Sequence, residues 1–263
     1  MKKQQDLFDF AYLTSNFQSH IDTLYSLARH ERWDYLRDPQ PNKHQVLWNY
    51  IRYTFKRLSY LHEKNPQEKY LYFSTRAFCF NTGLFTDRFE SIYALFAPND
   101  SGYTTQWKLQ GFYKESAHEL NKIHPLPQRA NYFDSVRDLI YDTRRDLRIN
   151  IDHILGDEEN LKRVPEQYRD MSSLPIKIRA HAVEYAKIRI QENYKAAVPQ
   201  YFNGKIQFLI PISLEDPTVV DLSLAVRRDG DVYTGKTCLT LDMAYNNARL
   251  IAKPESDWLI GGI

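Results

Sequence analysis

The chain has 263 residues, of which 43% are hydrophobic and 26% are charged, and its formal net charge is +2. This balance is typical of a globular protein with a sizeable core, and a charge so near neutral does not by itself indicate a nucleic-acid partner. No segment approaches the roughly 18 consecutive apolar residues of a membrane span. The first residues also lack the apolar run of a secretory signal. We therefore expect a cytoplasmic protein with no membrane partner.

Cysteine and aromatic content narrow the chemistry. The only two cysteines, Cys79 and Cys238, lie in apolar segments far from other metal-ligating residues. We expect two reduced thiols and no zinc site. The 19 tyrosines and 14 phenylalanines suit a core, an interface or a base-stacking surface equally well.

Two amphipathic helices are predicted in the N-terminal quarter. Apolar residues recur every three or four positions from Leu7 to about Arg29 and again from Val46 to Leu61. A loop containing Pro39 and Pro41 separates the two segments. Together they form an expected helical N-terminal lobe, residues 1–66.

Strand-like patterns follow from Tyr70 onward. Apolar residues on both sides of Ser74–Arg76 predict a hairpin, and aromatic-rich segments predict strands at 90–96 and 107–113, separated by a turn at 98–102. The structure of 131–144 is left open, and 149–155 resembles a short helix. A long helix is expected at 176–197, ended by Pro199. The last third predicts strands at 205–212, 219–228, 232–235 and 237–241, a tight turn at 228–231, and a helix at 242–251.

This order of elements favours an α+β fold. We expect a mainly antiparallel sheet or a partly closed barrel, with the helical lobe before it and the long helix preceding the C-terminal strands. No repeat or linker divides the chain. The expectation is a single domain, 1–263, with residues 67–263 forming the sheet-containing body.

The most unusual segment is Thr237–Arg249, at an expected strand-to-helix junction. Asp242 is predicted to cap the helix, and Asp242, Asn246 and Arg249 share one helical face. Adjacent asparagines are poor helix formers, and they are costly in a helix unless their side chains bond to something. A helix N-terminus at a strand end also suits an anion. The alternative is a helix cap followed by solvated polar residues. As ligand-binding candidates this segment contributes Tyr245, Asn246, Asn247 and Arg249.

A second set of candidates is Arg76, Asn81 and Thr82, beside Gly83. The simplest interpretation of Asn81-Thr-Gly83 is a turn, because asparagine bonds its own backbone and glycine accepts a positive φ. The functional interpretation places Asn81 and Thr82 at the end of a strand, facing a ligand. The chain has no phosphate-binding glycine loop of the P-loop type.

A third set lies between Arg148 and Arg163. His153 is the histidine best placed for acid–base chemistry because Asn150 and Asp152 lie beside it, although a structural role is the more common one for a single histidine. Arg163 is a candidate phosphate ligand. The motifs of zinc proteases, zinc deaminases and α/β-hydrolases are absent. Basic pairs such as Arg144-Arg145 and Arg227-Arg228 are a weak indication of a groove for a phosphodiester backbone.

Taken together, these motifs resemble a family of domains of unknown function, numbered 3825 (DUF3825). The resemblance covers roughly residues 40 to 260, and its most specific part is the last motif. The matching segments are Phe80–Leu84, Ile92–Phe96, Asn150, Asp152–Ile154, Arg163–Pro165, Ile210–Leu214, Asp221–Leu222 and Leu239–Leu250. Members occur beside modules linked to RNA, so the resemblance implies RNA or nucleotide handling by association, and it carries no activity.

Three functions follow from these candidates. The favoured one is an RNA- or nucleotide-binding domain with a polar pocket lined by asparagine and arginine. The first alternative is a phosphodiester or nucleotide hydrolase, in which His153 is the acid or base, Asp242 holds a divalent cation and Arg249 stabilises the developing charge. The second alternative is a protein-interaction module. Binding is favoured over hydrolysis because the sequence contains no complete catalytic set.

Overall fold

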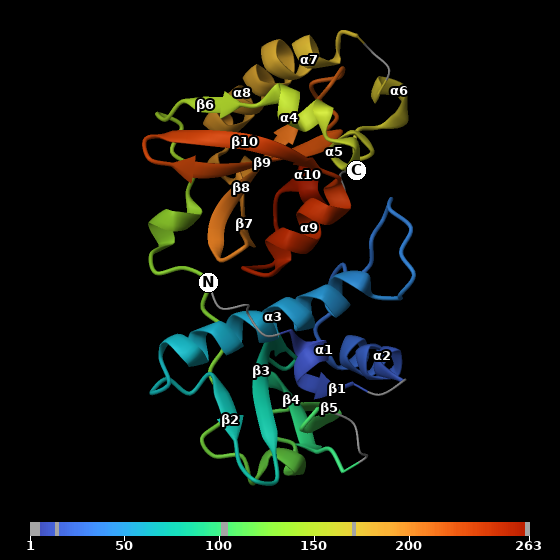
Figure 1. Cartoon of the computed structure of the whole chain (residues 1–263), viewed down its shortest axis with the longest axis vertical. Coiled ribbons are helices and arrows are strands. Elements are labelled where there is room, and N and C mark those ends of the chain that lie inside the picture. Colours follow the sequence, from blue (N-terminus) through green and yellow to red (C-terminus); the bar gives the residue numbers. More distant parts are fainter. Residues whose placement is uncertain (1–5, 14–15, 101–104, 170–171, 261–263) are drawn as a thin grey trace. The chain divides into compact units, whose positions relative to one another are not determined.

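The computed structural model describes residues 6–13, 16–100, 105–169 and 172–260. The chain forms two compact units, residues 1–131 and residues 132–263 (Figure 1). Each unit contains one five-stranded sheet with its own helices. The expectation that the whole chain is one domain stays a prediction.

The first expected helix is interrupted. It consists of α1 (Leu7–Phe10), a short strand β1 (Ala11–Tyr12) and α2 (Phe17–Leu27). The backbone is extended at Ala11, and β1 pairs in parallel with the start of β5. Helical periodicity continues through this segment, but pairing with a strand about 95 residues away in sequence overrides it. The prediction of one helix over 7–29 is therefore wrong in this part.

The second expected helix is confirmed as α3 (Gln45–Lys64). The first sheet has the order β1-β5-β4-β3-β2, formed further by β2 (Leu71–Phe73), β3 (Phe78–Phe85), β4 (Ser91–Pro98) and β5 (Trp107–Lys114). Helix α3 packs on one face of this sheet, where the ring of Phe55 lies 5.6 Å from that of Phe80. The predicted 70–80 hairpin and both following strands are confirmed. Part of the turn expected at 98–102 falls outside the described residues.

The opposite face of the first sheet has a smaller core. Cys79 and Tyr93 point into it and pack with Leu120 and Ile123, from the segment after β5. A 3₁₀ turn at His118–Leu120 positions this segment. The helical lobe of residues 1–66 therefore shares its unit with the first sheet, because that sheet needs α3 to cover one face.

The second sheet has the order β6-β10-β9-β8-β7. Its strands are β6 (Leu147–Ile149), β7 (Val198–Phe202), β8 (Lys205–Ile212), β9 (Leu222–Asp229) and β10 (Val232–Leu239). Only β6–β10 is parallel, as only β1–β5 is in the first sheet. The α+β class with mainly antiparallel sheets is confirmed. Within the described residues both sheets are open, so the alternative of a partly closed barrel is not met.

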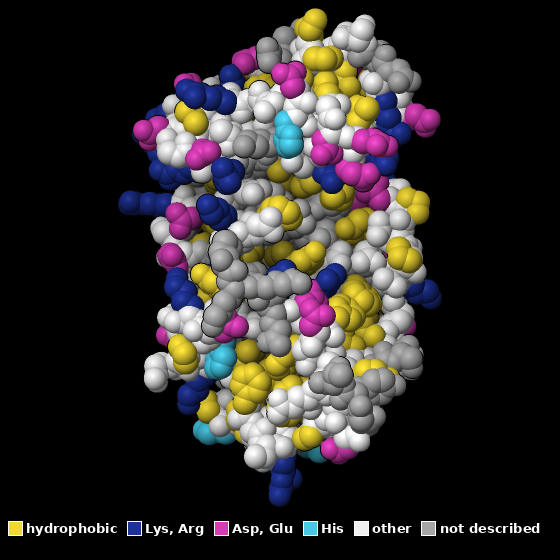
Figure 2. Space-filling model, in the orientation of Figure 1, with side chains coloured by type: hydrophobic (Ala, Val, Ile, Leu, Met, Phe, Trp, Pro, Cys, Tyr) yellow, Lys and Arg dark blue, Asp and Glu magenta, His cyan; other side chains and the backbone are white. Residues whose placement is uncertain are grey.

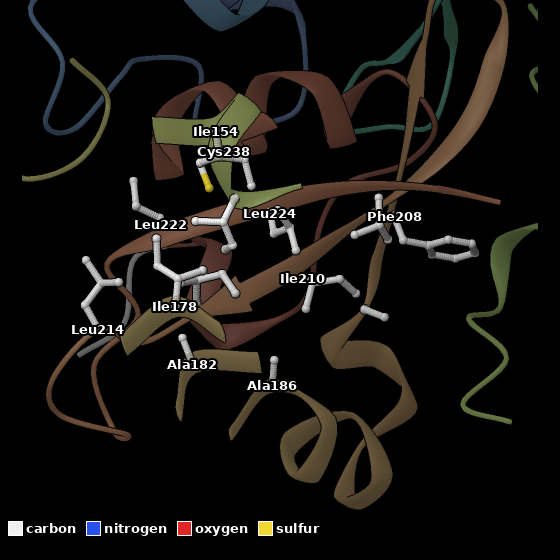
Figure 3. Close-up of a cluster of buried hydrophobic side chains, with 14 of the residues drawn as sticks. Ile154, Ile178, Ala182, Ala186, Phe208, Ile210, Leu214, Leu222, Leu224 and Cys238 are labelled. Atoms are coloured by element: carbon white, nitrogen blue, oxygen red, sulfur yellow. The ribbon is translucent and has the colours of Figure 1, made fainter. Parts of the chain in front are cut away.

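Short helices cover one face of the second sheet, which we call its core face. They are α4 (Ile151–Gly156), α5 (Glu158–Leu161), α6 (Glu166–Arg169), α7 (Leu174–Ile176), a π-helical turn (Lys177–Ala182) and α8 (Val183–Glu192). Figure 3 shows Ile178, Ala182 and Ala186 packed against Ile210 and Leu224. Every second residue of a strand points to the same face of the sheet, and on β8 and β9 these residues are apolar on the core face.

The predicted long helix ends earlier than expected. A 3₁₀ turn (Tyr194–Ala196) follows α8, and then β7 begins at Val198. Pro199, expected to stop the helix, lies within this strand. β7 is an edge strand, the place in a sheet where proline is tolerated. The dipeptide Asn203-Gly204, with φ of 48° and 81°, forms the turn between β7 and β8. Strand β7 is missing from the predicted elements, although this dipeptide is a hairpin signal that predicts it.

The C-terminal elements agree more closely with expectation. The 228–231 turn is confirmed, with Gly230 at φ 62°. The two predicted strands at 232–241 are one strand, β10, with a bulge between Gly235 and Thr237. Helix α9 (Leu241–Arg249) follows, and α10 (Asp257–Ile260) is the last helix. No described helix has the length and apolar character needed to cross a bilayer.

Candidate functional site

In the first unit, the Asn81–Gly83 motif lies inside β3. The expectation that it ends a strand is wrong, because the pairing with β4 resumes at Phe85 after an irregularity. Thr82 is fully buried, and its hydroxyl donates to the Ile92 carbonyl (2.7 Å) and accepts from the N–H of Leu84. These bonds hold the bulge in place of the ladder bonds that it interrupts.

Asn81 and Gly83 complete the bulge. The Asn81 side chain accepts from the Gly83 N–H (2.8 Å) and donates to the Pro127 carbonyl (3.3 Å). Gly83 has φ 79°, and a Cβ there would lie 2.7 Å from the Tyr50 hydroxyl. The Gly83 carbonyl accepts from Arg129. Each polar group of this motif therefore has a partner that supports the fold.

Arg76 is separated from the bulge. It is exposed at the β2–β3 turn, where its N–H donates to the Ser74 hydroxyl. Asn81 lies five residues further along the chain, roughly 15 Å in an extended strand. The structure does not bring Arg76 together with Asn81 and Thr82 in one site.

In the second unit, Thr240 caps α9. Its backbone is extended and its hydroxyl accepts from the N–H of Met243 (3.3 Å). The prediction that Asp242 is the cap is wrong by two residues. A threonine hydroxyl at the position just before the helix reaches the free N–H groups, whereas Asp242 is already in the first turn.

Helix α9 is more enclosed than expected. Asp242, Tyr245, Asn246 and Arg249 are 1%, 1%, 6% and 8% exposed, and none of the four is without an interaction partner. Only Met243 and Asn247 are half-buried in this helix. The solvated-residue alternative is therefore wrong for Asn246 and Arg249. A helix that carries polar groups into such an environment must satisfy them.

Asn247 connects α9 to the sheet through other amides. Its Nδ2 donates to Oε1 of Gln200 on β7 (3.0 Å), and Gln200 Nε2 donates to Oε1 of Gln207 on β8 (2.9 Å). Asn246 Nδ2 joins the other end, at 3.4 Å from Asn247 Oδ1. We call these four residues the amide chain. It runs from a buried helix, through a 1% exposed Gln200, to the half-buried Gln207.

The amide chain continues into a row of polar residues across the sheet. On β10, Thr234 pairs with Arg148 of β6 on one side and with Arg227 of β9 on the other. Extending the β8–β9 register by one residue places Gln207 opposite Arg227. Paired residues point to the same face of a sheet. Arg148, Thr234, Arg227 and Gln207 are therefore neighbours, and we call them the polar row.

The polar row lies on the face opposite the core face. That face also carries α9, as the Asn247–Gln200 bond requires. Arg148 is exposed, and the Arg227 side chain is 42% exposed and 3.2 Å from Asp229. Figure 2 shows Lys and Arg side chains gathered with acidic ones around β6 and the β9–β10 turn. An exposed pair of this kind is weak, so its arginine can exchange one anion for another.

The loop before β6 adds two arginines to this end of the sheet. Arg144 and Arg145 both contact Asp142, and Arg145 also donates to the Gly230 carbonyl (2.9 Å). Hydrogen bonds from Arg144 lower the pKa of Asp142 to about 2. Arg145 therefore contacts the β9–β10 turn, which directly follows Arg227-Arg228 in the chain.

The third set of candidates is dispersed. Asn150 caps α4, accepting from the N–H of His153 (2.9 Å). His153 is exposed, and its imidazole has no hydrogen bond or ion pair with another described residue. Arg163 donates to Asn160 (2.9 Å) and to the Cys238 carbonyl (3.1 Å), which ties α5 to β10. Asn150 and Arg163 therefore both support local structure.

Neither a metal site nor a reactive thiol is evident. Within the described ranges, no group of three or more His, Cys, Asp and Glu side chains could hold a metal ion. Burial raises the pKa of the Cys79 and Cys238 thiols to about 12, so both stay protonated near neutral pH.

Sequence reasoning missed Gln200, Gln207 and Thr234. Glutamine carries no motif, and its role here depends on strand register. The recognisable signals were the Asn203-Gly204 turn, which places Gln200 opposite Gln207, and the Arg227-Arg228 pair.

Comparison with protein families gives a match over most of the chain. A family model described as a domain of unknown function (DUF3825) covers residues 24–258. No curated protein and no solved structure matches the chain.

Proposed function

The chain belongs to the DUF3825 family, and from that premise we propose that its second unit binds RNA or a nucleotide over the polar row. The family description assigns no activity, so the proposal depends on the chemistry of the site. The observation that carries it is the register across β6, β10 and β9, which sets Arg148 and Arg227 on either side of Thr234.

The chemistry of the row fits a nucleic acid. Guanidinium groups form two parallel hydrogen bonds with a phosphate and remain charged at any physiological pH. Amide side chains such as Gln207 and Asn247 offer both a donor and an acceptor, the combination that reads base edges. Exposed side chains on a sheet face are also a common surface for single-stranded RNA. These features support binding through phosphate contacts with some base recognition.

Single-stranded RNA tests this proposal directly. Binding of a fluorescein-labelled 12-nucleotide oligouridine is measured by anisotropy at several salt concentrations. Changing Arg148→Gln together with Arg227→Gln should weaken binding about tenfold at low salt. It should also reduce the slope of log affinity against log salt by about 1.4, which is 0.7 for each lost phosphate contact.

The matched control removes two positive charges from the helices of the core face. Lys162→Gln with Lys187→Gln changes side chains that are 57% and 47% exposed and paired with glutamates. We expect this control to bind nearly as well as the parent protein. An equal loss in both double variants, or no binding by the parent protein at low salt, contradicts the proposal.

The hydrolase alternative has less support. His153 is exposed on α4, whereas Asp242 and Arg249 are 1% and 8% exposed on α9. A general acid and a charge-stabilising arginine must reach the same substrate atom group, whereas α4 packs on the core face of the sheet and α9 lies on the opposite face. No observation favours the protein-interaction alternative over the other two.

A further inference from the structure

A pocket lies at the far end of α9 from its cap. It has a volume of about 350 Å³ and is lined by the turn after α8, the start of β7, the end of α9 and the segment 252–256. This volume is at the lower end of the range of small-molecule sites. Neither the polar row nor the amide chain lines it. We call it the C-terminal pocket.

The walls of the pocket are held in place before any ligand arrives. The Ser256 hydroxyl donates to the Lys195 carbonyl (2.6 Å), and the Trp258 indole N–H donates to the Ala196 carbonyl (3.0 Å). These two bonds attach the C-terminal segment to the turn after α8. A ligand would therefore meet a formed cavity, with little ordering cost.

The pocket has an apolar floor and a cationic rim. Ala197, Val198 and Ala248 are 3%, 7% and 2% exposed and form part of its lining. Lys195 and Lys253 stand at the rim with a single acid, Glu255, whose carboxylate is 3.9 Å from the Lys195 ammonium. Lys253 has no ion pair with a described residue. The rim therefore carries a net positive charge.

An aromatic ring stands at the same pocket without a partner. Tyr194 is 59% exposed and lines the pocket, and its ring contacts no other aromatic or cationic group among the described residues. Its ring therefore offers an accessible flat apolar face to a ligand. An exposed tyrosine over an apolar floor provides the two surfaces that a flat heterocycle needs.

We propose that the C-terminal pocket binds one nucleoside 5′-monophosphate unit. The base lies between Tyr194 and the apolar floor, and the phosphate contacts Lys253 and Lys195. The inference rests on the proposed function. It narrows the class of ligand to a single nucleotide with a terminal phosphate monoester. Such a unit is found both as a free mononucleotide and at the 5′ end of a phosphorylated RNA.

Calorimetry with the full chain tests the pocket through fragments of the ligand. We expect AMP to bind more tightly than adenosine or inorganic phosphate. Tyr194→Ala should weaken binding of both AMP and adenosine about tenfold, whereas Lys253→Ala should weaken AMP alone. Tyr185→Ala and Lys187→Ala change exposed residues of α8 that do not line the pocket, and they should leave AMP binding unchanged. The thermal midpoint of each variant checks folding.

The outcomes separate the pocket from the polar row. Absence of AMP binding at millimolar concentration overturns the inference, and oligouridine binding that still depends on Arg148 and Arg227 would leave the proposed function standing. Binding of AMP without any binding of oligouridine supports the pocket and contradicts the polar row. Tighter binding of a 5′-phosphorylated trinucleotide than of AMP, lost in Tyr194→Ala, supports the pocket and identifies an RNA end as the source. Equal affinities support the pocket with a free nucleotide.

Discussion

An asparagine side chain takes part in the Asn81–Gly83 bulge of the first unit and another in the amide chain of the second unit, and the two asparagines have different kinds of partner. Asn81 bonds to the backbone of Gly83 and of Pro127, within a bulge that is closed to solvent. Asn247 bonds to another side chain, Gln200, in a chain of amides that leads to half-exposed Gln207.

The comparison shows that residue type does not distinguish a structural asparagine from a ligand-binding one. The distinction lies in the partner. An amide bonded to main-chain groups replaces missing ladder bonds and has little capacity left for a ligand. An amide bonded to another amide transmits a defined orientation to a surface group, which remains able to bind. Asn81 and Thr82 therefore lose support as ligand-binding residues, and Asn247 remains a candidate.

Thiol labelling is expected to give the largest effect. It reports on both regions, because one cysteine lies near the Asn81–Gly83 bulge and the other near α9. Cys79 is in β3 two residues before Asn81, and Cys238 is in β10 just before α9. Raising a thiol pKa from 9.0 to about 12 reduces the thiolate at pH 8 about a thousandfold. Both thiols should label at least that much more slowly in the native protein than in the denatured one, as followed by mass spectrometry.

The same labelling, repeated in urea with Cys79→Ala and Cys238→Ala, compares the stability of the two units. A single urea midpoint for both thiols is expected if the chain unfolds as one domain. Two separate midpoints would contradict the single-domain prediction. Rapid labelling of either thiol without urea would contradict the burial of its strand.

Gly83→Ala should be the most destabilising single substitution in the bulge. A side chain at φ 79° is strained, and the new methyl group would lie 2.7 Å from the Tyr50 hydroxyl. We expect the free energy of unfolding to fall by about 2 kcal/mol or more in urea denaturation. Gly156→Ala is the control, because a Cβ there meets nothing within 4 Å.

A double-mutant cycle with Tyr50→Phe separates the contact from the backbone strain. Removing the hydroxyl should recover part of the loss in Gly83→Ala, so the two changes should be coupled favourably. Additive effects would mean that the clash is relieved by movement of Tyr50. A change below about 0.5 kcal/mol in Gly83→Ala itself would contradict the account of the bulge.

Thr82→Val and Thr234→Val compare a threonine of the bulge with a threonine of the polar row. Thr82 is fully buried with two hydrogen bonds, and losing them should lower the free energy of unfolding by about 1–3 kcal/mol. Thr234 is half-buried, and its hydroxyl makes only a long hydrogen bond of 3.5 Å to the Arg227 carbonyl. Thr234→Val should therefore change the free energy of unfolding by less than about 0.5 kcal/mol. Comparable losses in urea unfolding would remove the distinction between the two regions.

Asp142→Asn should have the smallest effect, which is present above about pH 4 and disappears in acid. Hydrogen bonds from Arg144 lower the folded pKa of Asp142 to about 2, below its ordinary value of 3.8. A lowered pKa stabilises the fold above the ordinary value, and this contribution is lost as the pH falls from about 4 to about 2. The thermal midpoint of Asp142→Asn should therefore fall less over this range than that of the parent protein.

The control for this acid limb is Asp146→Asn, since Asp146 is exposed and has no ion pair with a described residue. It should retain the full acid dependence of the parent protein. If the thermal midpoints of Asp142→Asn and the parent protein fall equally in acid, the Arg144 contact does not affect stability.

Local sequence patterns were sufficient to predict the periodic elements and the family. Helix α3, the β2–β3 hairpin, β8 and α9 follow from spacing over a few residues, which local contacts enforce. Local pattern failed where distant pairing competes with it, at the interruption of the first helix by β1 and at Pro199 in an edge strand. It also misplaced the cap of α9, since aspartate is generally a better capping residue than the threonine that caps this helix.

Which polar residues lie together depends on how the strands pair. Asn81 and Asn247 both look suited to a ligand in sequence, and their partners differ because one lies in a bulge and the other lies over β7. The polar row depends on the register of four strands, which is set by core packing on the opposite face. Register is a property of pairs distant along the chain, so no window of sequence around Arg148 or Arg227 contains it.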